Sequence, residues 1–182
     1  SGWIPKVLWG GGLCFIPILN LFAFGYLVEF TRRLRRSNHC ELPEWNEMEI
    51  PRLFLEGLRM LLLVLAYVGL PMLFAWLLSF VLLFLSFGLL GIVSFFPIAI
   101  AGFFGPFLFL SALHTYLRDQ LFSDAWKVRE VFQSALPFWP RLAIPVVAFW
   151  GVFLLALPLY GMSFFIGTWV LLAHSTALQF ER

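Results

Sequence analysis

The chain has 182 residues, of which 62% are apolar and only 12% are charged, and its mean hydropathy is +0.92. Soluble domains are about 25% charged, so this composition excludes a water-soluble globular domain, and it is also far too apolar for a disordered chain. Hydrocarbon offers no water to backbone polar groups, so apolar runs without alternating polarity must be helical. We therefore predict an all-α integral membrane protein in a lipid bilayer. The small formal net charge of +2 gives no indication of a nucleic-acid partner.

Transmembrane helices are predicted from the stretches that contain no Lys, Arg, Asp or Glu. The long ones are residues 7–28, 60–117 and 142–180. A helix needs about 20 residues to cross a hydrocarbon core of about 30 Å, so the first stretch holds one crossing and the last holds two. The middle stretch is long enough for two long crossings or three short ones, and the charges of the connecting segments favour two. We expect a single membrane domain, 1–182, with a bundle of about five transmembrane helices near 6–30, 54–82, 92–117, 138–157 and 160–179.

The connecting segments 31–53 and 118–137 are basic, and they set the expected orientation. With two crossings between them, both lie on one side of the membrane, whereas three crossings would leave the basic residues of the second segment outside. The side with the excess of Lys and Arg is normally cytoplasmic. We expect the cytoplasmic (inner) membrane, with the N-terminus outside and the C-terminus in the cytoplasm.

The first basic segment begins with an arginine cluster, Arg32, Arg33, Arg35 and Arg36. At the depth of the lipid phosphates each arginine can contribute about 1 kcal/mol of attraction to an anionic leaflet. The favoured interpretation is a charge cluster that sets the topology, and the alternative is a docking site for lipid headgroups or a protein partner. An acidic stretch follows the cluster, and it can fold back and neutralise it: Glu41, Glu44, Glu47, Glu49 and Glu56.

The second basic segment carries apolar residues at helical spacing over residues 121–136. This pattern predicts an amphipathic helix that lies flat on the inner membrane surface. Trp126 is placed to sit at the interface, and Lys127 and Arg129 to contact headgroups or a partner. An amphipathic helix packed on its own bundle has the same pattern, so both interpretations stay open.

Short motifs mark both basic segments and the last helix. They are Gly25-Tyr26-Leu27 before the arginine cluster, Leu42-Pro43-Glu44-Trp45, Glu56-Gly57-Leu58-Arg59, Phe122-Ser123-Asp124-Ala125-Trp126, Val128-Arg129-Glu130-Val131 and Leu171-Leu172-Ala173-His174. Through them the sequence resembles a family of small multi-span membrane proteins of bacteria and archaea, known only as a domain of unknown function. The resemblance covers nearly the whole chain. It implies a helical membrane domain of this organisation and no particular reaction.

Polar side chains at bilayer depth are candidates for a ligand site, because burying them in hydrocarbon is unfavourable. His114 and His174 are predicted at similar depth, where imidazoles either anchor helix ends, the favoured interpretation, or ligate a tetrapyrrole metal. Asn20 is expected to join two helices. In the first loop, His39 and Cys40 supply too few ligands for zinc, so no metal is expected.

The chain shows no nucleophile motif, phosphate loop or pair of catalytic carboxylates. We therefore expect a protein that is not an enzyme: an accessory or scaffolding subunit of a membrane complex. It would pack through small-residue and aromatic helix faces against the bilayer, other membrane subunits or itself. The alternatives are a channel or small-solute transporter, with a polar passage lined by Asn20, Ser79, Ser111 and Thr168, and a pigment- or haem-binding subunit.

Overall fold

A computed structural model describes residues 2–37, 42–137 and 139–180, and within these ranges the chain is helical without any strand. The prediction of an all-α protein is confirmed. The chain forms two compact units. Unit 1 comprises Ser1–Leu61 and Pro140–Arg182, and unit 2 comprises Leu62–Trp139. Each unit is described by itself below.

Among the described residues, three helices are long and apolar enough to cross a membrane: Ile50–Leu85, Gly91–Arg118 and Leu157–Leu178. They correspond to the second, third and fifth predicted spans. The fourth predicted span contains α7 (Trp139–Leu155), whose 17 residues extend about 26 Å, slightly less than a hydrocarbon core. The structure therefore supports membrane integration through three helices, fewer than the predicted five.

The first predicted span is wrong as a single helix. Residues 6–30 belong to two helices, α1 (Trp3–Leu13) and α2 (Asn20–Ser37), which are separated by turns. Pro17 lies in the break, where it lacks a backbone N–H and disfavours helical backbone at the residue before it. With 11 residues, α1 extends only about 16 Å and is too short to cross.

The α1 helix also bears on the predicted orientation. The Lys6 Nζ atom lies 2.9 Å from Glu44 Oε1 and donates a hydrogen bond of 2.6 Å to the Leu42 carbonyl oxygen. The sequence predicted Lys6 outside and residues 31–53 in the cytoplasm. An ion pair cannot join residues on opposite sides of a core about 30 Å thick, so one of these two placements is wrong.

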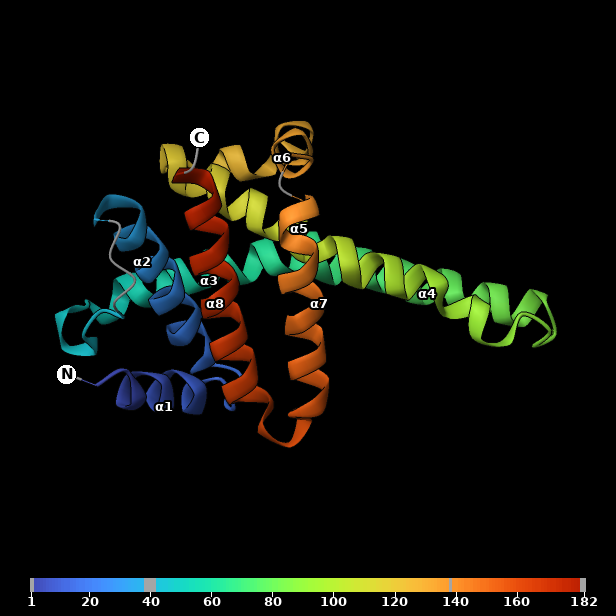
Figure 1. The fold of residues 1–182 in the computed structure, drawn as a ribbon, viewed down its shortest axis with the longest axis horizontal. Helices are drawn as coiled ribbons and strands as arrows, with labels where there is room; N and C mark the ends of the chain where they lie inside the picture. The colour runs from blue at the N-terminus through green and yellow to red at the C-terminus, as the bar shows by residue number, and fades with distance from the viewer. Residues whose placement is uncertain (1, 38–41, 138, 181–182) are drawn as a thin grey trace. The chain divides into compact units, whose positions relative to one another are not determined.

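Unit 1 is organised around α8 (Tyr160–Phe180), which follows the short 3-10 turn η5 (Leu157–Leu159). The α1 helix lies across the beginning of α8 (Figure 1). Just after α1 ends, the rings of Phe15 and Tyr160 meet edge to face, with ring centroids 4.8 Å apart. The α2 helix packs along α8 through aromatic pairs, among them Phe24 with Phe164. These apolar contacts hold α2 in place and so position its charged C-terminal half.

Unit 2 is built on α4 (Leu70–Leu85) and α5 (Phe96–Asp119), which lie side by side (Figure 1). Two short turns join the long helices: the π-helical η2 (Leu65–Gly69) continues α3 (Ile50–Val64) into α4, and the 3-10 turn η3 (Gly91–Phe95) leads into α5. Gln120, with a φ of 56°, ends α5 in a left-handed conformation.

The predicted amphipathic helix over 121–136 is divided in the structure. A 3-10 turn, η4 (Phe122–Trp126), is followed by α6 (Val128–Ala135), and the backbone leaves the helical region at Lys127, where ψ is 77°. The Tyr67 hydroxyl of η2 donates a hydrogen bond to the Ala125 carbonyl oxygen. This contact attaches η4 to its own unit and explains why one continuous helix does not form.

Candidate functional site

The candidate site lies in unit 1, where α2 crosses the beginning of α3. At the crossing the two backbones are in direct contact through Gly25 and Gly57. A methyl group at Gly25 would overlap the Leu53 carbonyl, and one at Gly57 would overlap the Leu21 carbonyl. Only glycine allows two helices to approach this closely. The family motifs that contain Gly25 and Gly57 therefore meet at one point of the fold.

A buried ion-pair network follows the crossing toward the C-terminal end of α2. Arg32 is 8% exposed, and its guanidinium nitrogens lie 2.8 Å from Glu29 Oε2 and 3.1 Å from Glu56 Oε1. The Arg59 guanidinium also pairs with Glu56, at 3.1 Å. Burial alone would lower the pKa of Arg32, but the Glu56 and Glu29 carboxylates outweigh it and raise the pKa above its usual value. Arg32 therefore stays charged and connects the two helices.

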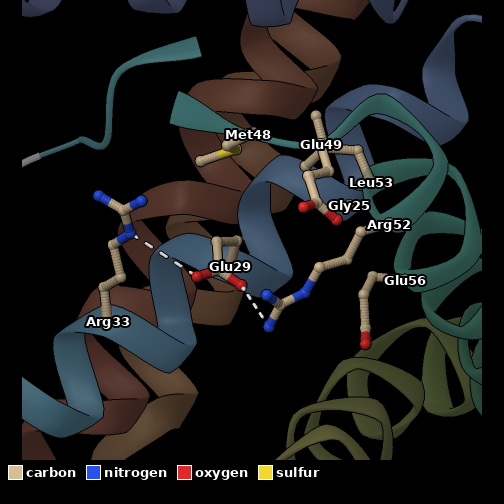
Figure 2. A pocket seen from close by; sticks show the side chains of 8 residues that line it. All are labelled: Gly25, Glu29, Arg33, Met48, Glu49, Arg52, Leu53 and Glu56. Atoms are coloured by element: carbon tan, nitrogen blue, oxygen red, sulfur yellow. Dashed lines mark ion pairs between the residues drawn. The ribbon is translucent and has the colours of Figure 1, made fainter. Parts of the chain in front are cut away.

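A pocket of about 150 Å³ opens beside this network (Figure 2). Five of its eight lining residues are charged; the full set is Gly25, Glu29, Arg33, Met48, Glu49, Arg52, Leu53 and Glu56. Figure 2 shows Glu29 between the two guanidiniums of Arg33 and Arg52, and each pair is 3.6 Å long. These distances exceed a normal hydrogen bond, so the guanidiniums are held at the pocket mainly by charge.

The segment between α2 and α3 is attached to α2 by side-chain contacts. The Tyr26 hydroxyl donates a hydrogen bond of 2.7 Å to the Pro43 carbonyl oxygen. Its ring stacks on Trp45, in the 3-10 turn η1 (Trp45–Glu47), with ring centroids 4.1 Å apart. With Lys6 on Glu44, these contacts hold the Leu-Pro-Glu-Trp motif against α2 and place the following residues, Met48 and Glu49, at the pocket.

The four predicted arginines have different roles. Arg32 is buried and is not available to lipid or partner, whereas the Arg33 side chain is 40% exposed at the pocket. Arg35 is half-buried and Arg36 is exposed at the end of α2. The prediction that the acidic stretch neutralises the arginine cluster is confirmed for Glu56, which pairs with Arg32. Two other residues of the acidic stretch are not covered, because Glu41 and the side chain of Glu47 lie outside the part that the structure describes.

Sequence reasoning missed Glu29 and Arg52 as parts of the site. For Glu29 a signal was available, because it precedes Arg32 and Arg33 by three and four positions, which places the three side chains on one face of a helix. For Arg52 no such signal exists. Its partner is 23 positions away, and only the crossing of α2 and α3 brings the two together.

The second predicted docking segment presents an apolar stripe. Val131 and Ala135 are buried within unit 2, while Val128, Phe132 and Leu136, spaced four residues apart, are each more than half exposed. Trp126 and Arg129 are also exposed. Lys127 pairs with Asp124 at 3.0 Å and with Glu130 at 3.7 Å, and the Asp124 contact raises the pKa of Lys127. One face of α6 thus packs on its own unit while another apolar face is uncovered.

The predicted intramembrane polar residues are distributed over both units. Asn20 is half-buried at the start of α2, and its Oδ1 atom has no hydrogen-bond partner among the described residues. His114 is half-buried in unit 2, and His174 is exposed in unit 1. No group of three metal-binding side chains occurs in the described part of the chain, and His39, Cys40 and Glu41 lie outside it.

In the part of the chain that the structure describes, the fold is all-helical, three helices are long and apolar enough to cross a membrane, and a charged pocket lies where two close-packed helices cross. The family of this protein is the one described as "Protein of unknown function (DUF4013)", to which the chain belongs through residues 10–172. The resemblance found in the sequence is thereby confirmed. No curated protein and no solved structure matches the chain.

Proposed function

We propose that this protein is a non-enzymatic accessory or scaffolding subunit of a complex in the cytoplasmic membrane. Its partners would be the bilayer and another membrane protein, or a second copy of the chain. Both basic segments would face the cytoplasm, and α7 would add a fourth crossing to the three long helices. A fifth crossing would have to use α1 and α2 together, which the Lys6–Glu44 ion pair opposes.

The uncovered apolar surface of the long helices carries this proposal. Of the residues in the most apolar part of Ile50–Leu85, only 11% are buried within the chain. Within unit 2, a groove of about 490 Å³ runs between α4 and α5, and its lining is almost wholly apolar: Pro71, Phe74, Ala75, Leu78, Pro97, Ile100, Ala101, Phe104, Gly105 and Leu108. The small residues Ala75 and Ala101 let another helix approach closely.

The experiment is to solubilise native membranes in a mild detergent and to size the particle that contains the chain. We expect a particle clearly larger than one 21.0 kDa chain in its micelle. Ile100→Trp, in the groove, should release the chain from this particle because it blocks helix packing. Ile144→Trp, at an exposed position of α7, is the matched control and should not. A wild-type chain recovered only as a monomer would contradict the subunit proposal.

The exposed stripe of α6 supports a second contact, with lipid at the cytoplasmic surface. Val128, Phe132 and Leu136 would enter the acyl boundary, with Trp126 at headgroup level. Because Val131 and Ala135 already pack inside unit 2, the helix has one face for the protein and one for the membrane. Both interpretations of the sequence pattern would then hold at once.

A further inference from the structure

We infer that the pocket between α2 and α3 binds a zwitterionic phosphoethanolamine group, in which a phosphate and a primary ammonium are two carbons apart. The inference deepens the proposed contact with lipid and rests on the proposed placement of the basic segments at the membrane surface. It is argued from the charges around the pocket, the absence of aromatic rings among its described lining residues, and the apolar surface beside it.

The phosphate would bind to Arg33 and Arg52. Their side chains are 40% and 56% exposed, and both guanidiniums reach the same carboxylate, Glu29, from two sides at 3.6 Å (Figure 2). A guanidinium has five N–H donors, more than one carboxylate oxygen can accept. Arginine pairs with phosphate through two parallel hydrogen bonds. The two side chains therefore form a clamp for a phosphodiester at the mouth of the pocket.

The ammonium would bind to Glu49. The other two carboxylates of the pocket, Glu29 and Glu56, are already paired with arginines, whereas Glu49 is exposed and forms no ion pair with any described residue. In Figure 2 its carboxylate points into the space that Glu29 and Arg52 also face. A plain phosphate in the arginine clamp would be repelled by Glu49. A ligand with an ammonium next to its phosphate pairs with the two guanidiniums and with the Glu49 carboxylate at the same time.

The ammonium should be primary rather than quaternary. Quaternary ammonium groups such as choline are recognised on aromatic faces, and none of the described lining residues is aromatic. A primary ammonium instead has three N–H donors to satisfy. The pocket supplies carboxylate oxygens for them, so its chemistry favours ethanolamine over choline.

The surface of α3 beside the pocket favours a bilayer lipid as the source of this group. Ile50, Phe54 and Leu58 are exposed apolar residues at spacings of four, which places them in one stripe along the helix. The same helix contributes Arg52 and Glu56 to the pocket. A lipid could thus place its headgroup between the helices and its acyl chains along the stripe, which a soluble compound would leave empty.

The test measures lipid retention by the purified full chain in detergent, by native mass spectrometry. Phosphatidylethanolamine, phosphatidylglycerol and phosphatidylcholine with identical acyl chains are compared. We expect phosphatidylethanolamine to be retained about tenfold more than the other two, the change expected from one charge-assisted hydrogen bond. Equal retention of the three lipids, or preference for phosphatidylglycerol, would overturn the inference.

Variants assign each charge its role. Glu49→Gln should lower retention of phosphatidylethanolamine about tenfold and leave phosphatidylglycerol unchanged or higher, because it removes the partner of the ammonium only. Arg52→Gln should lower retention of both. Arg36→Gln, exposed at the end of α2 and away from the pocket, is the control and should leave retention of both lipids unchanged. Unchanged lipid preference in Glu49→Gln would overturn the inference, provided that its thermal unfolding matches the wild type.

Soluble phosphoethanolamine separates the two sources of the group. If the source is a lipid, millimolar phosphoethanolamine should not displace the bound lipid. If soluble phosphoethanolamine binds to the protein by itself and this binding is lost in Glu49→Gln, the pocket recognises a phosphoethanolamine group as inferred, and its ligand is the free compound. The outcome is independent of the sizing experiment: a monomer that retains phosphatidylethanolamine selectively would contradict the subunit proposal and support the pocket.

Discussion

Arg32 lies almost fully buried between two carboxylates that come from different helices. A charge in such a position is stabilised only while its partners are present, because removal of a partner leaves an uncompensated buried ion. Glu29 belongs to the same helix as Arg32, whereas Glu56 belongs to α3. Glu56 is therefore the partner that makes the network join two segments of the chain.

Glu56→Gln tests this role. We expect it to lower the free energy of unfolding by about 1–3 kcal/mol, less than the full cost of an unpaired buried charge because Glu29 still holds Arg32. The measurement is equilibrium unfolding in mixed detergent micelles. Glu130→Gln, in an exposed pair with Lys127, is the control and should change the free energy by less than about 0.5 kcal/mol. Equal effects of the two variants would contradict a structural role for the network.

At the level of elements, the crossing of α2 and α3 depends on two glycines rather than on large apolar side chains. Gly25 and Gly57 each face a backbone carbonyl of the opposite helix, which cannot move aside as a flexible side chain can. The close approach also determines the distances within the ion-pair network and the pocket. Helix packing and charge recognition are thus coupled in this region.

Gly25→Ala and Gly57→Ala should each destabilise the protein by about 1–3 kcal/mol, the usual range for inserting a methyl group into a packed site. Gly151→Ala is the matched control, because Gly151 is also helical but has nothing within 4 Å of an added methyl group. It should be neutral or stabilising by up to about 1 kcal/mol, since alanine favours helix over glycine. Thermal and denaturant unfolding in detergent would compare the three. A loss of stability in Gly151→Ala, with none in Gly25→Ala or Gly57→Ala, would contradict the close crossing of α2 and α3.

The α6 helix is the second element whose two faces differ in a testable way. Nitroxide labels at Phe132→Cys and Gln133→Cys, in a chain with Cys14→Ala and Cys40→Ser, would report on adjacent exposed positions. In bilayers we expect the label at 132 to be accessible to dissolved oxygen and the label at 133 to a water-soluble nickel complex. Equal accessibility to the nickel complex at both positions would show that the stripe does not enter lipid.

For the whole molecule, the proposed arrangement places the connection between α4 and α5 on the opposite side of the membrane from both basic segments. Leu89, in that connection, is highly exposed, as are Arg36 and Gln133. In the same cysteine-free background, cysteines at 36 and 133 should react with an impermeant maleimide only in inside-out vesicles, and a cysteine at 89 only in intact cells. Labelling of 36 and 133 from opposite sides would overturn the arrangement.

The properties that the sequence by itself determined are those that depend on composition and on neighbouring residues. Low charge and long charge-free runs predicted a helical membrane protein, and the second, third and fifth predicted spans occur as helices of sufficient length. These predictions succeed because the length of an apolar run must match the thickness of the bilayer. The same reasoning failed for residues 6–30, where Pro17 and the following turns interrupt an apolar run without adding any charge.

Only the tertiary structure decided which of the charged residues form the site. Four arginines within five positions look alike in the sequence, yet Arg32 is buried while Arg36 is exposed. The difference arises because α3 crosses α2 at Gly25 and brings Glu56 and Arg52 to the face that carries Glu29 and Arg32. Such a meeting depends on backbone approach between segments distant in the chain, which local spacing and charge do not specify.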